Sequence, residues 1–353
     1  MSLYAYTRIA ENHYRERFGL DFEDFKVGQK FRHRPGVTLS QQDNVDEALD
    51  TVNAAMIHYD AKYSAQTAWK RELMVSTVTL QRLIGMSSKT FGRKHVLKGF
   101  SEIAMTSPIF GGDTIYAESE ITAVNPGPDQ NHGEVTVICR GTNQDGREFA
   151  RVTYRALVWR RGHHPENRSA DYVAGTPVEE ARFLAHRTEP NGALVEQVGL
   201  FFEDCRADET FVHWPRRSML RDEGMEHAWR SLELNPQYHD LEWIREHGGG
   251  VFRFTEPWIV GVATAMTTRT FGRVVANLGW TDVEFGAEVA VGDTLEAEST
   301  IFDKRESKSR PNEGILGVET RAYNQKRERV MSYRRRLLVY KRDAQTPYAA
   351  AGY

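Results

Sequence analysis

The chain has 353 residues, of which 40% are hydrophobic and 27% are charged, a composition typical of a soluble globular protein. Its 46 basic side chains nearly balance 49 acidic ones, so no overall positive field favours nucleic acid. No apolar run approaches the roughly 18–20 residues that span a bilayer, and the first residues lack the pattern of a signal peptide. Two cysteines, Cys139 and Cys205, are too few for a disulfide framework or a thiolate metal site. We therefore expect a cytoplasmic protein without a bound metal.

In chain order, a strand-like segment at 28–33 is followed by a long polar stretch and an apolar helix at 73–85. Four β runs come next, at about 95–106, 113–124, 133–143 and 148–160. After a polar, turn-rich segment, a second strand-like segment at 209–214 precedes a second apolar helix at 258–266. Four further β runs follow, at about 274–286, 293–303, 314–325 and 329–341. A largely apolar helix ahead of antiparallel strands predicts an α+β layer in which a sheet wraps around a buried helix.

The two halves repeat each other at a spacing of 180 residues. The recurring segments are Phe22-Glu23-Asp24 with Phe202-Glu203-Asp204, Phe31 and His33 with Phe211 and His213, and Lys89-Thr90-Phe91-Gly92-Arg93 with Arg269-Thr270-Phe271-Gly272-Arg273. Such a period is too long for a solenoid, whose units run about 20–50 residues, and indicates a duplicated domain. We predict an N-terminal domain at 1–161, a linker at 162–188, a C-terminal domain at 189–345 and a tail at 346–353. Function should lie where the copies differ, because only the packing residues need to be shared.

Several of these segments resemble the MaoC-like enoyl-CoA hydratases. The resemblance rests on Phe-Glu-Asp-Phe-Lys-Val-Gly at 22–28, on Gly-Asp-Thr before a strand, and on His-Tyr-Asp before the central helix. The segments 275–280, 292–295 and 306–315 are similar to the mesaconyl-CoA hydratase, or methylmalyl-CoA dehydratase, branch. The resemblance covers most of 20–160 and 200–342 and implies a double hot dog fold.

The same resemblance implies reversible hydration of a 2-enoyl-CoA thioester, with a short-chain or branched dicarboxylic acyl group such as mesaconyl. The CoA thioester is then the substrate, and no separate cofactor is expected. Neither nucleic acid nor membrane is expected as a partner, and a homo-oligomer of the double hot dog unit stays open.

The family's signature places an Asp five residues before a His and an acidic residue two after it, and the Asp and the His share the attacking water. His58 and Asp60 in the first copy fit this signature, but Asn53 stands in the place of the Asp. If the segment is helical, Asp50 shares a face with His58 and could be a displaced base, while Asn53 could instead hold the water. The family also implies a backbone N–H donor for the thioester oxygen at the start of the central helix. We expect Ser76 and Thr77 to supply this donor.

The second copy carries Tyr238 in the place of the histidine, with His239 one residue later and Glu233 five residues before Tyr238. We therefore expect catalysis in the first copy and a binding role in the second, with the reverse assignment as the alternative.

Two other functions are open. One is a non-catalytic acyl-CoA-binding protein, which the missing Asp at position 53 supports. The other is an acyl-CoA thioesterase, which typically needs a carboxylate on or beside the central helix. The stretches from Leu73 to Lys89 and from Trp258 to Thr270 contain no Asp or Glu, which argues against the thioesterase.

Overall fold

The computed structural model describes residues 3–165, 172–342, 344 and 346–348, which form two compact units. The C-terminal unit holds the described parts of Met1–Arg17, Glu166–Leu184 and Val198–Ala351, and the N-terminal unit holds Phe18–Pro165 and Ala185–Gln197. The predicted domains follow the chain continuously, whereas the compact units exchange two short segments. Residues 1–17 belong to the C-terminal unit and residues 185–197 to the N-terminal unit. Part of the predicted linker, 166–171, and part of the predicted tail, 349–353, lie outside the described residues.

The N-terminal unit is built on a sheet whose seven described strands run in the order β4-β7-β6-β5-β3-β10-β9. These strands are β3 (Lys30–Thr38), β4 (Lys94–Met105), β5 (Thr114–Pro126), β6 (His132–Asn143), β7 (Glu148–Trp159), β9 (His186–Thr188) and β10 (Leu194–Glu196). Neighbours are antiparallel except that β10 runs parallel to β3. The four long β runs predicted from alternating hydrophobicity agree with β4 to β7 within about two residues at each end.

The C-terminal unit repeats this sheet and adds strands to it, in the order β13-β16-β15-β14-β11-β2-β1-β8, with β12 also paired to β14. Its described strands are β1 (Tyr6–Ala10), β2 (His13–Glu16), β8 (Thr176–Pro177), β11 (Thr210–Val212), β12 (Arg217–Ser218), β13 (Val274–Phe285), β14 (Thr294–Glu306), β15 (Glu313–Tyr323) and β16 (Arg329–Tyr340). Strand β2 runs parallel to β11, as β10 does to β3 in the other unit.

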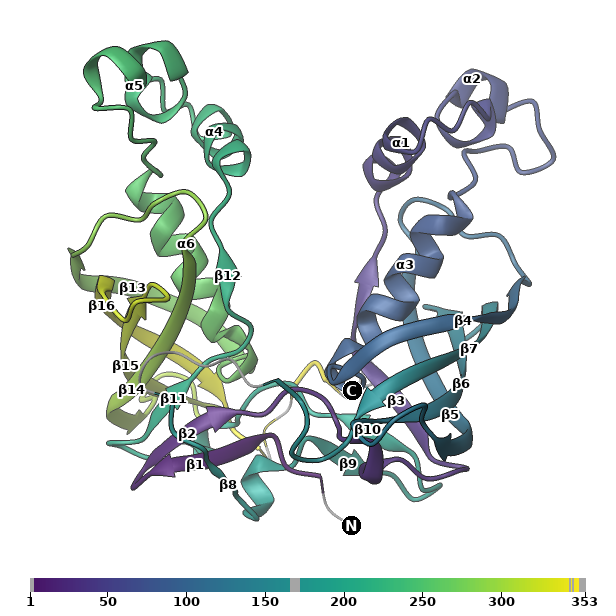
Figure 1. Ribbon diagram of the computed structural model, residues 1–353, viewed down its shortest axis with the longest axis horizontal. Helices are drawn as coiled ribbons and strands as arrows, with labels where there is room; N and C mark the ends of the chain where they lie inside the picture. The colour runs from purple at the N-terminus through teal and green to yellow at the C-terminus, as the bar shows by residue number, and fades with distance from the viewer. Residues whose placement is uncertain (1–2, 166–171, 343, 345, 349–353) are drawn as a thin grey trace. The chain divides into compact units, whose positions relative to one another are not determined.

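One central helix packs on each sheet (Figure 1). In the N-terminal unit α3 (Ser76–Met86) packs against β3, β5 and β6, and in the C-terminal unit α6 (Glu256–Met266) packs against β14 and β15. The buried residues of α6 recur at helical spacing, so one face of the helix contributes to the core. An antiparallel sheet around a central helix, present twice, confirms the predicted α+β double hot dog.

Short helices precede each central helix in the chain, and Figure 1 shows α1 and α2 beyond one end of α3. They are α1 (Gln41–Asp50), η2 (Met56–His58) and α2 (Ala61–Ser64) in the first copy, and α4 (Arg221–Arg230), η6 (Pro236–Tyr238) and α5 (Leu241–His247) in the second. The remaining single turns are η1 (Phe22–Asp24), η3 (Ser87–Lys89), η4 (Ala181–Phe183), η5 (Phe202–Asp204) and η7 (Thr267–Arg269). Among the described residues, no helix has the length and apolarity to cross a membrane.

Each exchanged segment contains a buried glutamate that contacts a histidine, and this histidine stands at the same position in both copies. In the N-terminal unit the fully buried His33 places Nδ1 3.0 Å from Glu196 Oε1 and Nε2 2.8 Å from Ser119 Oγ. Thr90 donates to the same Glu196 oxygen at 2.6 Å. Burial by itself would raise the pKa of Glu196, but the charge and hydrogen bond of His33 outweigh it and lower this pKa to about 2.

The C-terminal unit repeats this network with Glu16, His213, Ser299 and Thr270. His213 lies 2.8 Å from Ser299 Oγ and 3.4 Å from Glu16 Oε1, and Thr270 donates to Glu16 at 2.5 Å. The recurring histidine and threonine are thus buried packing residues that hold the exchanged strands, and the functional site must be sought elsewhere.

Candidate functional site

His58 lies in η2, half-buried, just ahead of α3 in space. Its Nδ1 is 2.7 Å from the carbonyl oxygen of Leu73. Because a carbonyl oxygen only accepts hydrogen bonds, Nδ1 carries a proton. No hydrogen bond from the rest of the described chain reaches Nε2. In the neutral imidazole Nε2 is therefore the nitrogen with the lone pair, and it has no hydrogen-bond partner among the described residues.

The backbone around His58 is tied to the start of α3 by Asn44, a fully buried residue of α1. Asn44 Nδ2 donates to the carbonyl oxygens of His58, at 2.8 Å, and of Leu73, at 3.1 Å. Asn44 Oδ1 accepts from the N–H of Val75 at 2.7 Å. Gln41, one turn earlier on α1, also donates to the His58 carbonyl oxygen at 2.8 Å. Neither residue was among those predicted from the sequence, although the second copy differs at both positions, with Arg221 in place of Gln41 and Gly224 in place of Asn44.

The first residues of α3 are Ser76 and Thr77, and both are exposed. The N-cap residue Val75 gives no side-chain cap, and neither backbone N–H of Ser76 and Thr77 has a hydrogen-bond acceptor among the described residues. Two free donors therefore stand at the positive end of the helix dipole, where they favour an oxygen that gains negative charge. That they bind the thioester oxygen stays a prediction.

The structure does not bring Asp50 or Asn53 to His58 by any hydrogen bond of the described chain. Helix α1 ends at Asp50, which is exposed, and Val52 follows with a positive φ of 56°. The segment from Asp50 to His58 is therefore not one helix, and the condition under which these two residues would share a helical face is not met. Asn53 Oδ1 accepts from the N–H of Ala55 at 2.9 Å, which shapes the turn.

Two carboxylates that the sequence analysis overlooked lie beside the central helices. Thr77 Oγ1 donates to Glu47 Oε1 of α1 at 2.5 Å, and Gln81 donates to the same oxygen at 3.0 Å. In the second copy α6 begins at Glu256, two residues before the predicted helix. The expectation that neither central helix has a carboxylate on or beside it is therefore wrong. The pattern at 73–89 could not reveal Glu47, because tertiary packing brings it there from α1.

The second copy lacks the features that distinguish the first. Tyr238, at the place of the histidine, is buried and donates to Glu256 Oε2 at 2.9 Å. Burial and the neighbouring Glu256 carboxylate raise the pKa of Tyr238 to about 12. Pro257 follows Glu256 in the first turn and has no N–H. Pro257 offers no N–H to an oxyanion at this helix start, and the Glu256 carboxylate would repel one, so the geometry favours the first copy.

The other candidates in the second copy serve local structure. The ring of His239 lies beside that of Trp229, with centroids 6.4 Å apart, and Glu233 accepts from the N–H of Asn235 at 2.9 Å. The acid that follows the histidine place caps a helix in both copies, through Asp60 at α2 and Asp240 at α5.

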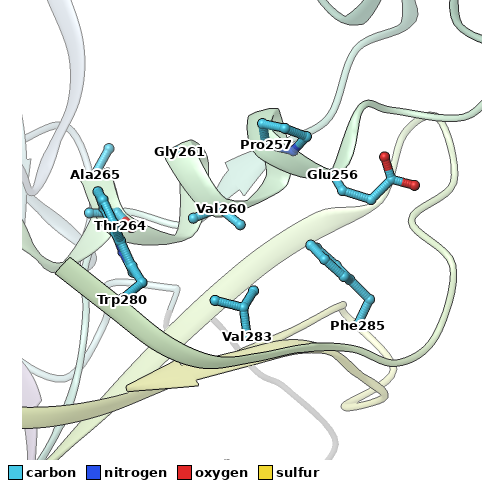
Figure 2. Close-up of a pocket in the computed structure, with 9 residues that line it drawn as sticks. All are labelled: Glu256, Pro257, Val260, Gly261, Thr264, Ala265, Trp280, Val283 and Phe285. Carbon is cyan, nitrogen blue, oxygen red and sulfur yellow. The ribbon is translucent and has the colours of Figure 1, made fainter. Parts of the chain in front are cut away.

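A cavity of about 650 Å³ lies in the C-terminal unit between α6 and β13. Figure 2 shows Trp280, Val283 and Phe285 of β13 facing α6, with Glu256 at the end of the row. Its lining residues are Glu256, Pro257, Val260, Gly261, Thr264, Ala265, Trp280, Val283 and Phe285. The lining is largely apolar, so this cavity suits an uncharged apolar group better than an anion.

Residues 185–351 match the family model described as mesaconyl-CoA hydratase. The mesaconyl-CoA hydratase of Cereibacter sphaeroides is 35% identical over 43% of this chain and 44% of its own length. The β-methylmalyl-CoA dehydratase of Chloroflexus aurantiacus is 26% identical over 33% of this chain and 34% of its own length. The alignments thus span less than half of these relatives.

Among solved structures, a putative MaoC domain protein dehydratase from Chloroflexus aurantiacus has a TM-score of 0.40 at 16% identity, over 92% of this chain and 98% of that one. A conserved hypothetical protein from Mycobacterium tuberculosis described as having a double hotdog fold has a TM-score of 0.38 at 20% identity, over 91% and 99%. The similarity rests on the sequence matches. Residues 185–351 of this chain are thus similar to the mesaconyl-CoA hydratase family.

Proposed function

We propose that this protein is a hydro-lyase that interconverts a 2-enoyl-CoA thioester and the corresponding 3-hydroxyacyl-CoA in its N-terminal unit. One observation carries the proposal: a histidine with a free Nε2 and a helix start with two free N–H groups are tied together by one buried side chain. That combination is absent from the described part of the second copy.

In the direction of hydration, the thioester oxygen accepts hydrogen bonds from the N–H groups of Ser76 and Thr77. Nε2 of His58 takes a proton from water while the water oxygen forms a bond to C3 of the enoyl group. The electron pair of the double bond moves towards the thioester oxygen, where the helix start stabilises the enolate. The proton held by His58 then passes to C2, so one group acts as base and then as acid. A positioned acid–base group of this kind gives about 10²–10⁴-fold in rate.

A short-chain or branched dicarboxylic acyl group such as mesaconyl is the proposed substrate, since two relatives are named for mesaconyl-CoA and β-methylmalyl-CoA. The CoA ester is itself the substrate, and we propose no further cofactor. Thioester hydrolysis is the second candidate function, because Glu47 is held beside the start of α3 and could activate water against the thioester carbonyl.

A panel of short branched, dicarboxylic and straight-chain enoyl-CoA esters tests the proposal. Loss of the enoyl-thioester absorbance measures hydration, and free thiol measures hydrolysis. His58→Ala should lower kcat for hydration by about 10²–10⁴-fold with KM nearly unchanged. The matched control Tyr238→Phe removes a hydroxyl at the same place of the other copy and should stay within a few-fold of the unmodified protein.

Three outcomes would contradict the proposal. If Tyr238→Phe abolishes turnover and His58→Ala is silent, the active copy is the second one. Release of thiol without loss of the double bond would favour the thioesterase. Binding of every ester without turnover would favour the non-catalytic acyl-CoA-binding protein.

A further inference from the structure

We propose that Asn44 is the positioning residue of this site, one side chain that fixes both the tautomer of His58 and the first turn of α3. The inference rests on the proposed function. Asn44 touches no reacting atom in the proposed mechanism, so its effect passes through backbone groups.

Asn44 is linked to the imidazole of His58 through the carbonyl group of Leu73. Its oxygen accepts two hydrogen bonds, one from Asn44 Nδ2 at 3.1 Å and one from His58 Nδ1 at 2.7 Å. A carbonyl oxygen has two lone pairs, and Asn44 occupies one while the other receives the imidazole N–H. Because Asn44 also binds the His58 carbonyl oxygen, at 2.8 Å, the donor and the acceptor of the imidazole bond are held by the same amide. This leaves Nε2 as the basic nitrogen, as an orienting group does for other catalytic histidines.

Asn44 is linked to the start of α3 through Val75. Its N–H donates to Asn44 Oδ1 at 2.7 Å, and its backbone, with φ −59° and ψ 127°, is not yet helical. This bond fixes the residue from which α3 departs, and therefore the direction of the free N–H groups of Ser76 and Thr77. The side chain of Asn44 is fully buried, and Gln41 Oε1 also lies 3.2 Å from its Nδ2. The two hydrogens of this amide are therefore shared among Gln41 Oε1 and the carbonyl oxygens of His58 and Leu73.

The second copy shows the same position without the site. Gly224 stands 180 residues after Asn44, and a Cβ there would meet Phe254 at 2.7 Å. Aromatic packing has replaced the amide in the copy that carries Tyr238 in place of the histidine. The amide and the histidine are therefore present together in one copy and absent together in the other.

Nuclear magnetic resonance of protein labelled with ¹⁵N-histidine tests the tautomer directly, with His58→Gln to assign the signals. In the unmodified protein His58 should be protonated on Nδ1. Asn44→Ala and the isosteric Asn44→Asp, which accepts from Val75 but lacks the amide donors, should lose this single tautomer. The control Asn324→Ala removes another buried asparagine, one that forms hydrogen bonds only within its own turn, and should leave the tautomer unchanged.

Kinetics supply the second readout. Both Asn44 variants should lower kcat by about 10–100-fold with KM within a few-fold, the range seen when partners that orient other functional histidines are removed. A His58 that is protonated on Nε2 in the unmodified protein overturns the inference even if no Asn44 variant folds. Folded Asn44 variants that keep both the tautomer and kcat also overturn it. If the unmodified protein hydrates no ester but the tautomer depends on Asn44, the proposed function fails and the positioning role stands.

Discussion

Replacement of Glu196 by alanine should destabilise the N-terminal unit, although residue 196 directly precedes the C-terminal part of the chain. The carboxylate accepts from His33 Nδ1 at 3.0 Å, from Thr90 Oγ1 at 2.6 Å and from the N–H of Arg34 at 3.1 Å. Its side chain is 0% exposed, so no water can replace these partners. Removal of one partner from a buried, hydrogen-bonded charge pair costs about 3–5 kcal/mol. We expect Glu196→Ala to lower the free energy of unfolding of the N-terminal unit by that amount.

Hydrogen–deuterium exchange followed by mass spectrometry locates the effect. Glu196→Ala should raise exchange in β3 and β5 and leave β14 unchanged, and urea unfolding should give the free energy. The mirrored variant Glu16→Ala should raise exchange in β11 and β14 by a smaller amount, because Glu16 makes longer bonds to His213 and Trp214, of 3.4 and 3.3 Å. If Glu196→Ala instead loosens β14, or loosens nothing, the exchange of segments is refuted.

Two further predictions concern the stability of the N-terminal unit at acidic pH and the effect of alanine at glycines with positive φ. Burial lowers the pKa of His186 to about 4 from 6.5, so unfolding is favoured by protonation. The N-terminal unit should therefore have its full stability above pH 6.5 and lose up to about 3 kcal/mol as the pH falls to 4, which His186→Asn should abolish in urea titrations. Gly19→Ala should lower Tm far more than Gly146→Ala. Both glycines have a positive φ, +79° and +75°, so an alanine at either position costs about 1–2 kcal/mol of backbone strain. Only at Gly19 would the added Cβ also meet a backbone atom, Arg93 N at 2.4 Å. Equal effects of the two alanines, or a pH-independent stability, would contradict these expectations.

The long strands and central helices were predictable because alternation and helical spacing report burial directly. All eight long β runs agree with the structure within about three residues, and α3 and α6 begin within three residues of their predicted starts. The exchange of segments was not predictable from such patterns. Strands β2 and β10 have four and three residues, too few for a periodic signal, and no local pattern states which copy a strand joins. The one available sign was that Glu16 and Glu196 keep the common spacing of 180 residues.

Residues of the candidate site could be proposed from the sequence only where the family pattern includes them. His58 and the start of α3 came from that pattern, while Asn44 and Glu47 did not, because both act from α1 through tertiary contacts. The helical extrapolation from Asp50 to His58 failed at Val52. A positive φ is unfavourable for a β-branched residue such as Val52. The local sequence therefore did not predict a turn at this position.

The exchanged strands bear on how a duplicated gene can diverge. A chain cut after residue 165 would lack β9, β10 and the carboxylate that His33 needs, and a chain begun at residue 18 would lack β1, β2 and the partner of His213. Neither half is then a self-sufficient module, so loss of either copy would damage the other. The fold therefore requires the second copy, even though Tyr238 and Pro257 stand there at the places of His58 and Thr77.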